Sequence, residues 1–528
     1  MQPQPVSFRK PVNEAIKPAA DDNIVLCTLN ARYIHTSLGL RYLQANMGTL
    51  KNQTRIFEFT INQRVTDIAE QLLASNPGII GFGVYIWNIR ETTTLVCLIK
   101  KINPSIKIVI GGPEVSYEYQ DTRIFNACDY LITGQADFAF GNLCEDILRD
   151  ASSGSKVISA PTPLVKDLQL PYYLYSDDDI KNRVLYVEAS RGCPFKCEFC
   201  LSALDKTAYP FDLSTLLQEL ETLYNRGARQ FKFVDRTFNL KISNCTTILQ
   251  FFLDRLTTEN DLFLHFEVIP DKLPEALKEQ IIKFASGSLQ FEIGIQSFDS
   301  AVQKTINRKQ NIDTTIENLR WLHQHSNAHI HADLIFGLPG ETLDTFAHGF
   351  NQLVELAPDE IQLGILKRLR GSPIIRHTEV FRMCYSDEAP YQLLQNRDVD
   401  FKTMQAVQRF SRYWDLIANS GRFKNTLPLL LKDEPFERFM QISDWLYDTT
   451  GQTHQIAYNR LLELVYNAAV AKQLANQSIL RTALALDCKN NGDAHPPRWL
   501  REYMPDNKIV SKARKNATPS RQSRHLSH

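Results

Sequence analysis

The chain has 528 residues, enough for about two to four domains, and its 43% hydrophobic content is that of an ordinary globular protein. Its 59 Lys and Arg residues balance its 59 Asp and Glu residues, so no overall field favours nucleic acid or an anionic membrane as a partner. We expect neither a signal peptide nor a membrane span, and the ten cysteines lack the density of a secreted disulfide scaffold. A cytoplasmic protein is therefore expected.

The first part of the chain predicts an α/β domain. Residues 1–22 are rich in proline and are interpreted as a flexible tail. Over residues 23–150, short apolar runs alternate with helical patterns, which predicts a doubly wound, Rossmann-like parallel sheet. The expected strands are residues 24–29, 55–60, 79–85, 107–110 and 130–132. Ligands of such sheets bind beyond the carboxyl ends of the strands.

The rest of the chain predicts a second α/β domain and a helical extension. Residues 151–183 are rich in Ser, Gly and Pro and are interpreted as a linker. A second alternation over residues 184–373 predicts a partial parallel (β/α)6 barrel, and residues 374–504 have a helical pattern. Residues 505–528 are expected to be a basic, disordered tail. The expected barrel strands are residues 184–189, 230–234, 262–268, 289–295, 329–336 and 360–366.

Three cysteines at the start of the second domain form a C-x3-C-x2-C run, namely Cys193, Cys197 and Cys200. Thiolates favour iron–sulfur clusters, zinc or copper(I). Three close thiolates without an adjacent fourth would leave one iron of a 4Fe-4S cluster open to a further ligand. On spacing alone, a structural zinc site completed by a His or a distant Cys, or simple buried thiols, remain alternatives.

Polar residues are expected inside the predicted barrel. Alternate residues of a barrel strand face its interior, and buried polar groups cost free energy unless they are hydrogen-bonded. The pattern therefore indicates either a polar ligand or a buried network that satisfies itself. The inward-facing residues are expected to be Glu292, Gly294 and Gln296 on one strand, His329, His331 and Asp333 on another, and His265 and Glu267 on a third.

The cysteine run resembles the signature of the radical S-adenosylmethionine (SAM) superfamily. In that superfamily three cysteines hold a 4Fe-4S cluster, and its open iron binds the amino and carboxylate groups of SAM. Further segments resemble the cobalamin-associated branch of the superfamily, namely 231–239, 292–297, 306–308 and 333–342. Together these motifs imply a radical-SAM fold for the whole second domain.

The resemblance also implies which residues contact SAM. Phe199 would pack near the adenine, and Glu267 would bind the ribose. Gln296, Arg308 and Asp333 would line the SAM pocket. The Gly-Gly-Glu motif that holds the SAM amino group in other members is absent, and Asp235 is our candidate for that role.

Segments 28–35, 84–88 and 111–117 resemble a cobalamin-binding domain, and each follows an expected strand. With the rest of the chain they resemble a family of uncharacterised cobalamin-binding radical-SAM proteins that has a helical C-terminal extension of unknown function. The resemblance covers roughly residues 23–430. It implies cobalamin contacts at Leu29, Asn30, Tyr85, Trp87, Asn88, Gly111, Gly112, Pro113 and Gly134.

Two departures from the cobalamin-binding pattern stand out. The Asp-x-His-x-x-Gly motif is missing, because His35 precedes Gly39 by four residues and has no aspartate two residues before it. We interpret His35 as a loop residue or a contact to another part of the corrin. The family's Gly-Glu-Gly-Glu stretch reads Gly-Gln-Ala-Asp at residues 134–137. A sheet that no longer binds cobalamin is therefore an alternative.

The resemblance implies that a 4Fe-4S cluster reductively cleaves SAM to methionine and a 5′-deoxyadenosyl radical, which takes a hydrogen from an unactivated carbon. Methylcobalamin would then donate a methyl group to that carbon. The alternatives are a cobalamin- or SAM-dependent radical rearrangement or cyclisation without methyl transfer, and a metal-stabilised interaction protein. The expected partners are a small-molecule or peptide substrate and an external one-electron reductant of the flavodoxin or ferredoxin type.

Overall fold

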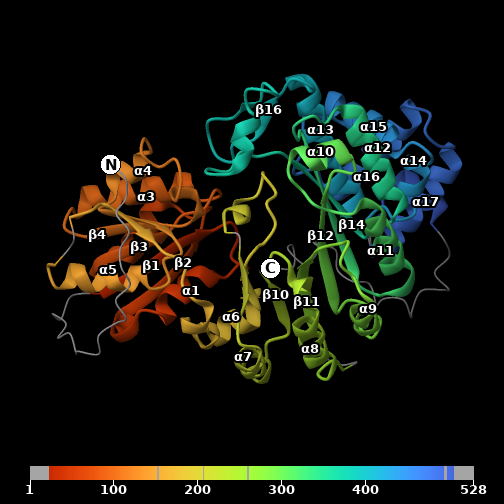
Figure 1. Ribbon diagram of the computed structural model, residues 1–528. Helices are drawn as coiled ribbons and strands as arrows, with labels where there is room; N and C mark the ends of the chain where they lie inside the picture. Colours follow the sequence, from red (N-terminus) through yellow and green to blue (C-terminus); the bar gives the residue numbers. More distant parts are fainter. Residues whose placement is uncertain (1–22, 152–153, 206, 258–260, 493–495, 505–528) are drawn as a thin grey trace.

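The computed structural model describes residues 23–151, 154–205, 207–257, 261–492 and 496–504. Two parallel sheets follow one another along the chain, and helices of the C-terminal region cover the far side of the second sheet (Figure 1). The tails predicted at 1–22 and 505–528 lie outside the described residues. Within the described ranges, no helix combines the length and the apolar character needed to cross a membrane.

The first sheet has six parallel strands in the order β2-β1-β3-β4-β5-β6. All five predicted strands are confirmed: β1 (Asn23–Asn30), β2 (Thr54–Thr60), β3 (Pro77–Gly83), β4 (Lys107–Gly111) and β5 (Tyr130–Gly134). The sixth strand, β6 (Val157–Ala160), pairs with β5 and lies in the segment interpreted as a linker. The apolar run of β6 is short and follows a Ser-rich stretch, so the sequence does not predict a strand there.

Side chains of the first sheet alternate between two apolar layers. Val25, Cys27 and Leu29 pack in one layer, and Ile24 and Leu26 pack in the other. The first layer is covered by α2 (Val65–Leu73), α3 (Ile89–Ile102) and α4 (Arg123–Ala127), and the second by α1 (Leu38–Ala45) and α5 (Ala139–Leu148). The predicted doubly wound sheet is confirmed.

The chain between the two sheets is packed against the second domain. It contains α6 (Asp177–Asn182), and Tyr172 and Tyr175 are fully buried. The Tyr172 hydroxyl donates to the backbone oxygen of Glu188 (3.1 Å), and the Tyr175 hydroxyl donates to that of Tyr186 (2.7 Å). Because its apolar side chains join the core of the second domain, this segment is not the loose linker that its composition indicates.

The second sheet is parallel, in the order β14-β13-β12-β11-β10-β7, with β7 and β14 as its two edges. All six predicted strands are confirmed: β7 (Leu185–Val187), β10 (Gln230–Phe233), β11 (Phe263–Val268), β12 (Leu289–Gln296), β13 (His329–Phe336) and β14 (Glu360–Ile365). An antiparallel pair, β8 (Ser190–Gly192) with β9 (Ala208–Pro210), flanks the cysteine run. The connecting helices are α7 (Leu213–Asn225), α8 (Ile242–Leu253), α9 (Glu275–Ile281), α10 (Ser300–Thr305), α11 (Ile312–His325) and α12 (Leu343–Glu355).

A helical region follows the second sheet, as predicted. The chain first forms the short helix η7 (Pro373–His377) and a hairpin of β15 (Cys384–Tyr385) and β16 (Leu393–Gln395), which extends toward the first domain in Figure 1. Aromatic rings pack the helices that follow against α12. The ring centre of Phe350 lies 5.2 Å from that of Phe410, which lies 4.9 Å from that of Phe436. The helices are α13 (Phe401–Trp414), α14 (Leu427–Leu431), α15 (Pro435–Thr450), α16 (Tyr458–Ala471) and α17 (Gln477–Asn490).

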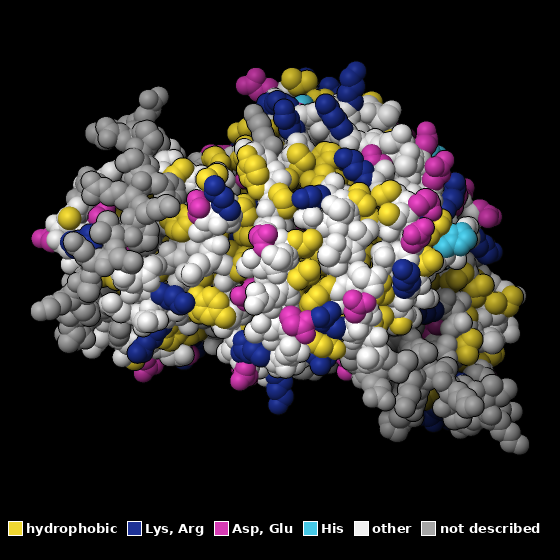
Figure 2. All heavy atoms as spheres, turned by 60° about the horizontal axis from the view of Figure 1, so that its bottom comes forward, with side chains coloured by type: hydrophobic (Ala, Val, Ile, Leu, Met, Phe, Trp, Pro, Cys, Tyr) yellow, Lys and Arg dark blue, Asp and Glu magenta, His cyan; other side chains and the backbone are white. Residues whose placement is uncertain are grey.

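The balanced composition of the chain is visible on its surface. On the face shown in Figure 2, basic and acidic side chains are interspersed with hydrophobic ones. This face therefore shows no large area of a single charge sign.

A buried ion network joins the first domain to the start of the second. Arg41 of α1 lies 2.9 Å from Glu58 and 2.8 Å from Asp179, and Arg183 lies 2.8 Å from both carboxylates. All four side chains are 5–8% exposed. Burial raises the pKa of the Glu58 and Asp179 carboxyls, but the guanidinium groups more than offset this, so both pKa values are lowered. The network is thus ionised and electrically neutral.

Removing one charge from this network should destabilise the fold. Asp179→Asn leaves two buried guanidinium groups with one carboxylate, and we expect the free energy of unfolding to fall by about 3–5 kcal/mol in urea denaturation. Asp177→Asn is the matched control, because Asp177 lies in the same helix, is 91% exposed and pairs with Arg226. The control should cost less than about 1 kcal/mol. Equal losses for the two variants would contradict the role given to the network.

Candidate functional site

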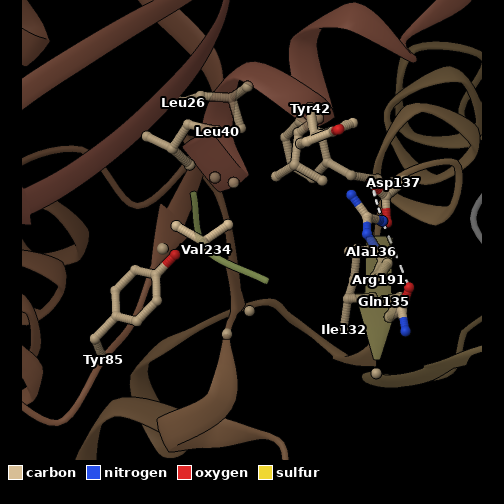
Figure 3. Close-up of a pocket in the computed structure, with 18 of the residues that line it drawn as sticks. Leu26, Leu40, Tyr42, Tyr85, Ile132, Gln135, Ala136, Asp137, Arg191 and Val234 are labelled. Carbon is tan, nitrogen blue, oxygen red and sulfur yellow. Dashed lines mark hydrogen bonds and ion pairs between the residues drawn. The ribbon is translucent and has the colours of Figure 1, made fainter. Parts of the chain in front are cut away.

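A cavity of about 410 Å³ lies where the carboxyl ends of the first sheet meet the start of the second domain (Figure 3). In Figure 3, Tyr85 forms one wall, and Arg191 with Gln135 and Asp137 forms the opposite wall. Half of the lining residues from the second domain lie in 188–192, directly before Cys193, and the others are Ser202, Asp205, Val234 and Arg236. The cavity is therefore shared by both domains and adjoins the cysteine run.

The part of the cavity in the first domain is lined by apolar side chains and by glycines. Its apolar lining is Leu26, Leu40, Leu43, Val109, Ile132 and Phe140, and its glycines are Gly39, Gly81, Gly83, Gly111, Gly112 and Gly134. Gly112 has φ +117°, and a Cβ at that position would collide with the carbonyl oxygen of Val84. Only glycine is compatible with this backbone. An apolar hollow with six glycines in its wall has room for a large ligand with a flat surface.

Four of the nine predicted cobalamin contacts line this cavity: Tyr85, Gly111, Gly112 and Gly134. The other five, Leu29, Asn30, Trp87, Asn88 and Pro113, are not among its lining residues. Asn88 is fully buried, and its amide donates to Thr28 Oγ1 (3.2 Å) and to the backbone oxygens of Leu29 (3.0 Å) and Gly83 (3.2 Å). Asn88 therefore ties the end of β1 to the end of β3.

His35 and Asn30 belong to the interface between the domains. The Asn30 amide donates to the His35 backbone oxygen (2.8 Å), and His35 Nδ1 lies 2.7 Å from the Tyr186 hydroxyl. The ring of Trp87 stacks on that of Tyr85, with the ring centres 4.4 Å apart. Its indole N–H donates to the Leu29 backbone oxygen (3.2 Å). Trp87 thus supports a ring that does line the cavity.

The cysteine run forms a loop between β8 and the turn at 201–204. Cys193 and Cys197 are buried and Cys200 is partly exposed. In the described part of the chain, no three His, Cys, Asp or Glu side chains lie close enough together to hold one metal ion. A zinc site needs about four ligands around a single ion, whereas each thiolate of an iron–sulfur cluster binds a different iron. The three thiols of this loop could each bind a different iron of a cluster.

Burial raises the pKa of the Cys193 and Cys197 thiols. Arg308 opposes this at Cys197, because its Nη1 lies 3.5 Å from the sulfur. Nη2 of Arg308 donates to the backbone oxygen of Gly294, and its Nε donates to Gln310 (2.8 Å). Arg308 thus holds a positive charge beside the cysteine loop.

The structure brings Gln296 and Arg308 to the same place as Cys197. A Cβ on Gly294 would collide with the Gln296 amide and would lie 3.5 Å from Arg308. Gln296 is 9% exposed, has φ +74°, and its buried amide oxygen has no hydrogen-bond partner in the described chain. An unsatisfied buried oxygen is costly, which is consistent with a ligand that donates to it.

The predicted inward polar residues face one another across the second sheet. Glu292 lies 3.0 Å from His265 and 3.7 Å from Lys232, and His331 lies 3.3 Å from Asp333. Burial lowers the pKa of His265 to about 4, so this ring is neutral at pH 7. The Glu292 carboxylate is nevertheless 27% exposed. The residues therefore form a partly self-satisfied network that a ligand can still reach.

Two predicted SAM contacts have protein partners. Asp235 is buried and accepts hydrogen bonds from the Ala189 amide (2.8 Å) and the Ser190 hydroxyl (2.6 Å), just before the cysteine loop. Burial raises its pKa to about 7. Glu267 lies 3.3 Å from Arg236, which lines the cavity.

The other two predicted SAM contacts, Phe199 and Asp333, lie in different parts of the second domain. Phe199 is partly buried and packs against the core of the second domain. Asp333 lies on β13 beside His331.

Glu198, inside the cysteine run, has a role that we did not predict. Its carboxylate is 3% exposed and binds Arg376 and His377 of η7, the latter at 2.6 Å. Its backbone oxygen accepts from Ile374 (2.8 Å) and its amide donates to Ile306 (3.0 Å). Arg376 is 178 residues away in sequence, so no local pattern reveals the contact. Glu198 clamps the loop to the chain that follows β14.

Comparison with known families agrees with this geometry. Residues 24–143 match the B12 binding domain, residues 187–353 match the Radical SAM superfamily, and residues 379–525 match a protein family of unknown function, DUF4080. The chain therefore combines a B12-binding domain, a radical SAM core and a DUF4080 C-terminal region. The first two domains imply 4Fe-4S, SAM and cobalamin as cofactors, and the chain has the domains of a radical SAM enzyme.

Distant relatives include methyltransferases. The chain is 25% identical over 334 residues to the "Uncharacterized methyltransferase PH0819" of Pyrococcus horikoshii, covering 58% of this chain and 70% of that protein. It is 26% identical over 331 residues to the "Cobalamin-dependent radical SAM methyltransferase TokK" of Streptomyces tokunonensis, covering 55% of this chain. The chain spans about half of TokK, at 47% of its length.

Solved structures share the fold. The cobalamin-dependent SAM radical enzyme OxsB, with aqua-cobalamin and SAM bound, aligns with a TM-score of 0.62 at 14% identity, covering 92% of this chain and 84% of that one. The arrangement of both sheets and the helical region is thus an established one.

Glu198→Gln should weaken retention of the cluster. The neutral amide cannot neutralise Arg376, and loss of a contact that orients ligands typically costs about 10- to 100-fold in metal affinity. We expect iron and sulfide per chain to fall after anaerobic reconstitution followed by exposure to a chelator. Glu379→Gln is the control, because Glu379 is exposed in the same part of the chain. Retention equal to that of the control would contradict the clamp.

Proposed function

We propose that this chain uses SAM, a 4Fe-4S cluster and cobalamin to transfer a methyl group to an unactivated carbon of its substrate. The observation that carries the proposal is the shared cavity, which the glycine-lined end of the first sheet and the chain leading into the cysteine run line together. Cofactors at these two sites would face the same cavity. The distant methyltransferase relatives support methyl transfer as the reaction.

The donor groups fit the implied cofactors. Cys193, Cys197 and Cys200 would hold the cluster, and Tyr85 with the glycine-rich wall would hold cobalamin. When bound, the cluster supplies the electron that cleaves SAM, and cobalamin supplies the methyl group. The protein would supply the orientation of the two cofactors.

Side chains beside the cysteine loop would orient SAM. The buried amide oxygen of Gln296 would accept a hydrogen bond that it lacks within the described protein. Arg308, next to Cys197, would attract the SAM carboxylate. Glu267, partly exposed at 23%, would accept from the ribose hydroxyls.

A second candidate is a radical rearrangement or cyclisation without methyl transfer. One observation favours it: the segment that replaces the family's acidic stretch is occupied by contacts between the domains. Gln135 donates to Asp205 (3.2 Å), and Asp137 pairs with Arg191 (3.0 Å). A first domain that holds no corrinoid would still serve to pack against the second domain through these contacts.

Replacing any one of the three motif cysteines with alanine should abolish formation of 5′-deoxyadenosine from SAM. The protein is produced anaerobically with cobalamin supplied, reconstituted and reduced, and the nucleoside is quantified by chromatography. Cys97→Ala is the control, because Cys97 is partly buried on α3, away from the motif. Persistent 5′-deoxyadenosine from Cys193→Ala, Cys197→Ala or Cys200→Ala would overturn the proposed function.

Corrinoid content tests whether the first domain is a working cofactor site. The proposed methyl transfer requires near one corrinoid per chain, and none in a protein that still cleaves SAM leaves the second candidate. Where corrinoid is bound, the mass of the product separates the two reactions, because methyl transfer adds one methyl group and rearrangement adds nothing. Gly83→Val should lower corrinoid content about tenfold, because a Cβ at Gly83 makes only ordinary contacts of 3.4–3.6 Å and the added methyl groups would occupy the cavity. Cluster content should not change. Unaltered corrinoid binding would show that the ligand lies elsewhere.

A further inference from the structure

The glycine wall of the cavity at the end of β4 continues into a loop, residues 112–118. Gly111 and Gly112 line the cavity. Within the first domain this stretch is anchored at Val84, whose amide donates to the Gly111 backbone oxygen (2.8 Å) and whose backbone oxygen accepts from the Glu114 amide (3.5 Å). Glu114 follows Gly112 by two residues and is 5% exposed. The partners of its buried carboxylate come from outside the first domain.

Two side chains from distant parts of the sequence hold the Glu114 carboxylate. The hydroxyl of Tyr391, 277 residues away, donates to it, and Arg370 Nε lies 3.2 Å from the same oxygen. Arg370 Nε also donates to the Tyr391 hydroxyl (2.9 Å). Tyr391 is 5% exposed and belongs to the C-terminal region that matches a family of unknown function. The three side chains thus join the first domain, the chain after β14 and the C-terminal region.

Burial governs the protonation of this group. It raises the pKa of Tyr391 to about 12, so the hydroxyl keeps its proton at neutral pH and donates to the carboxylate. Burial also raises the pKa of the Glu114 carboxyl, and the Tyr391 hydroxyl and the Arg370 guanidinium oppose that rise. Removing the hydroxyl would leave a buried acceptor with one donor fewer, which costs free energy.

The hairpin of β15 and β16 carries Tyr391 between its two strands and is fixed to the end of the second sheet. The Arg368 amide donates to the Tyr391 backbone oxygen (3.0 Å), and the Leu393 amide donates to the Leu366 backbone oxygen (2.8 Å). The hairpin extends toward the first domain (Figure 1). The backbone of Tyr391 is therefore anchored on the second domain while its side chain reaches the first.

Contacts at the far end of the loop run between the same partners. The Glu118 carboxylate accepts from the Gly371 amide (3.0 Å) and pairs with Arg368 (2.9 Å). Gly371 has φ +81°, and a Cβ at that position would collide with the ring of Tyr117. The loop that begins at Gly112 is thus bound by the second domain and the hairpin at both Glu114 and Glu118.

We propose that the hairpin of the C-terminal region positions the corrinoid-binding wall of the first domain, with Tyr391 acting through Glu114 on the loop that begins at Gly112. Tyr391 is not among the residues that line the cavity, so it is a positioning residue and not a catalytic one. A ligand that requires an ordered loop binds more weakly when that loop is partly displaced. The proposal rests on the proposed function, because the wall has this task only if it binds a corrinoid.

Tyr391→Phe tests the proposal on the full-length protein with its cluster reconstituted. Hydroxocobalamin is titrated in, and binding is followed by visible absorbance. We expect the dissociation constant to rise about 5- to 10-fold, because a hydrogen bond to a charged group typically shifts an equilibrium by about one power of ten. Iron and sulfide content should not change. Tyr385→Phe is the matched control in the same hairpin, since the Tyr385 hydroxyl donates to the Met383 sulfur (3.2 Å), and it should leave the dissociation constant unchanged.

A double-variant cycle tests whether Tyr391 acts through Glu114. Glu114→Ala removes the acceptor and should by itself weaken hydroxocobalamin binding. Once the carboxylate is absent, the Tyr391 hydroxyl has nothing to hold, so the double variant E114A/Y391F should bind within about 2-fold of E114A. Effects of the two substitutions that multiply in the double variant would contradict the route through Glu114.

Hydrogen exchange provides a readout that needs no corrinoid. In the protein without added corrinoid, the amides of residues 112–118 should exchange faster in Tyr391→Phe than in Tyr385→Phe. Equal hydroxocobalamin affinity for these two variants would overturn the positioning role, whatever the exchange rates. Absence of hydroxocobalamin binding by the unaltered protein would instead overturn the proposed methyl transfer, and equal exchange rates would then overturn the contact of the hairpin with the loop as well.

Discussion

The buried network of Arg41, Glu58, Asp179 and Arg183 sets how the two domains meet. Each guanidinium contacts both carboxylates, so four charges that would be costly to bury singly are neutralised together. Arg183 lies two residues before β7, and the network therefore fixes the first strand of the second sheet against α1 and β2. The same network thus helps to hold together the two domains that line the cavity.

A second group of contacts joins the chain after β14 to the first domain. Arg368 pairs with Glu118 (2.9 Å), and Arg370 pairs with Glu114 (3.2 Å), directly after the glycines at the end of β4. A few residues later, η7 binds the cysteine loop through Glu198. One short segment after β14 thus contacts both the first domain and the cysteine loop.

Glu292 in the second sheet pairs with neighbouring side chains and also remains open to a ligand. The neutral ring of His265 lies 3.0 Å from Glu292, and Lys232 lies nearby at 3.7 Å, so the carboxylate is compensated before any ligand enters. The Glu292 side chain is still 27% exposed, so a ligand can reach its carboxylate. Packing of the strands and access for a ligand are both maintained.

The sequence alone determined the eleven strands expected in the two sheets and the helical end of the chain, because period-two apolar runs and helical patterns are local signals. It also placed the cysteine loop and Gly112, whose roles follow from residue type. It did not reveal that Asn88 ties β1 to β3, that Asp235 holds Ala189 and Ser190, or that Glu198 binds η7. Those roles depend on which distant segments meet, and pairing of distant residues leaves no trace in local spacing. Only the tertiary structure decided them.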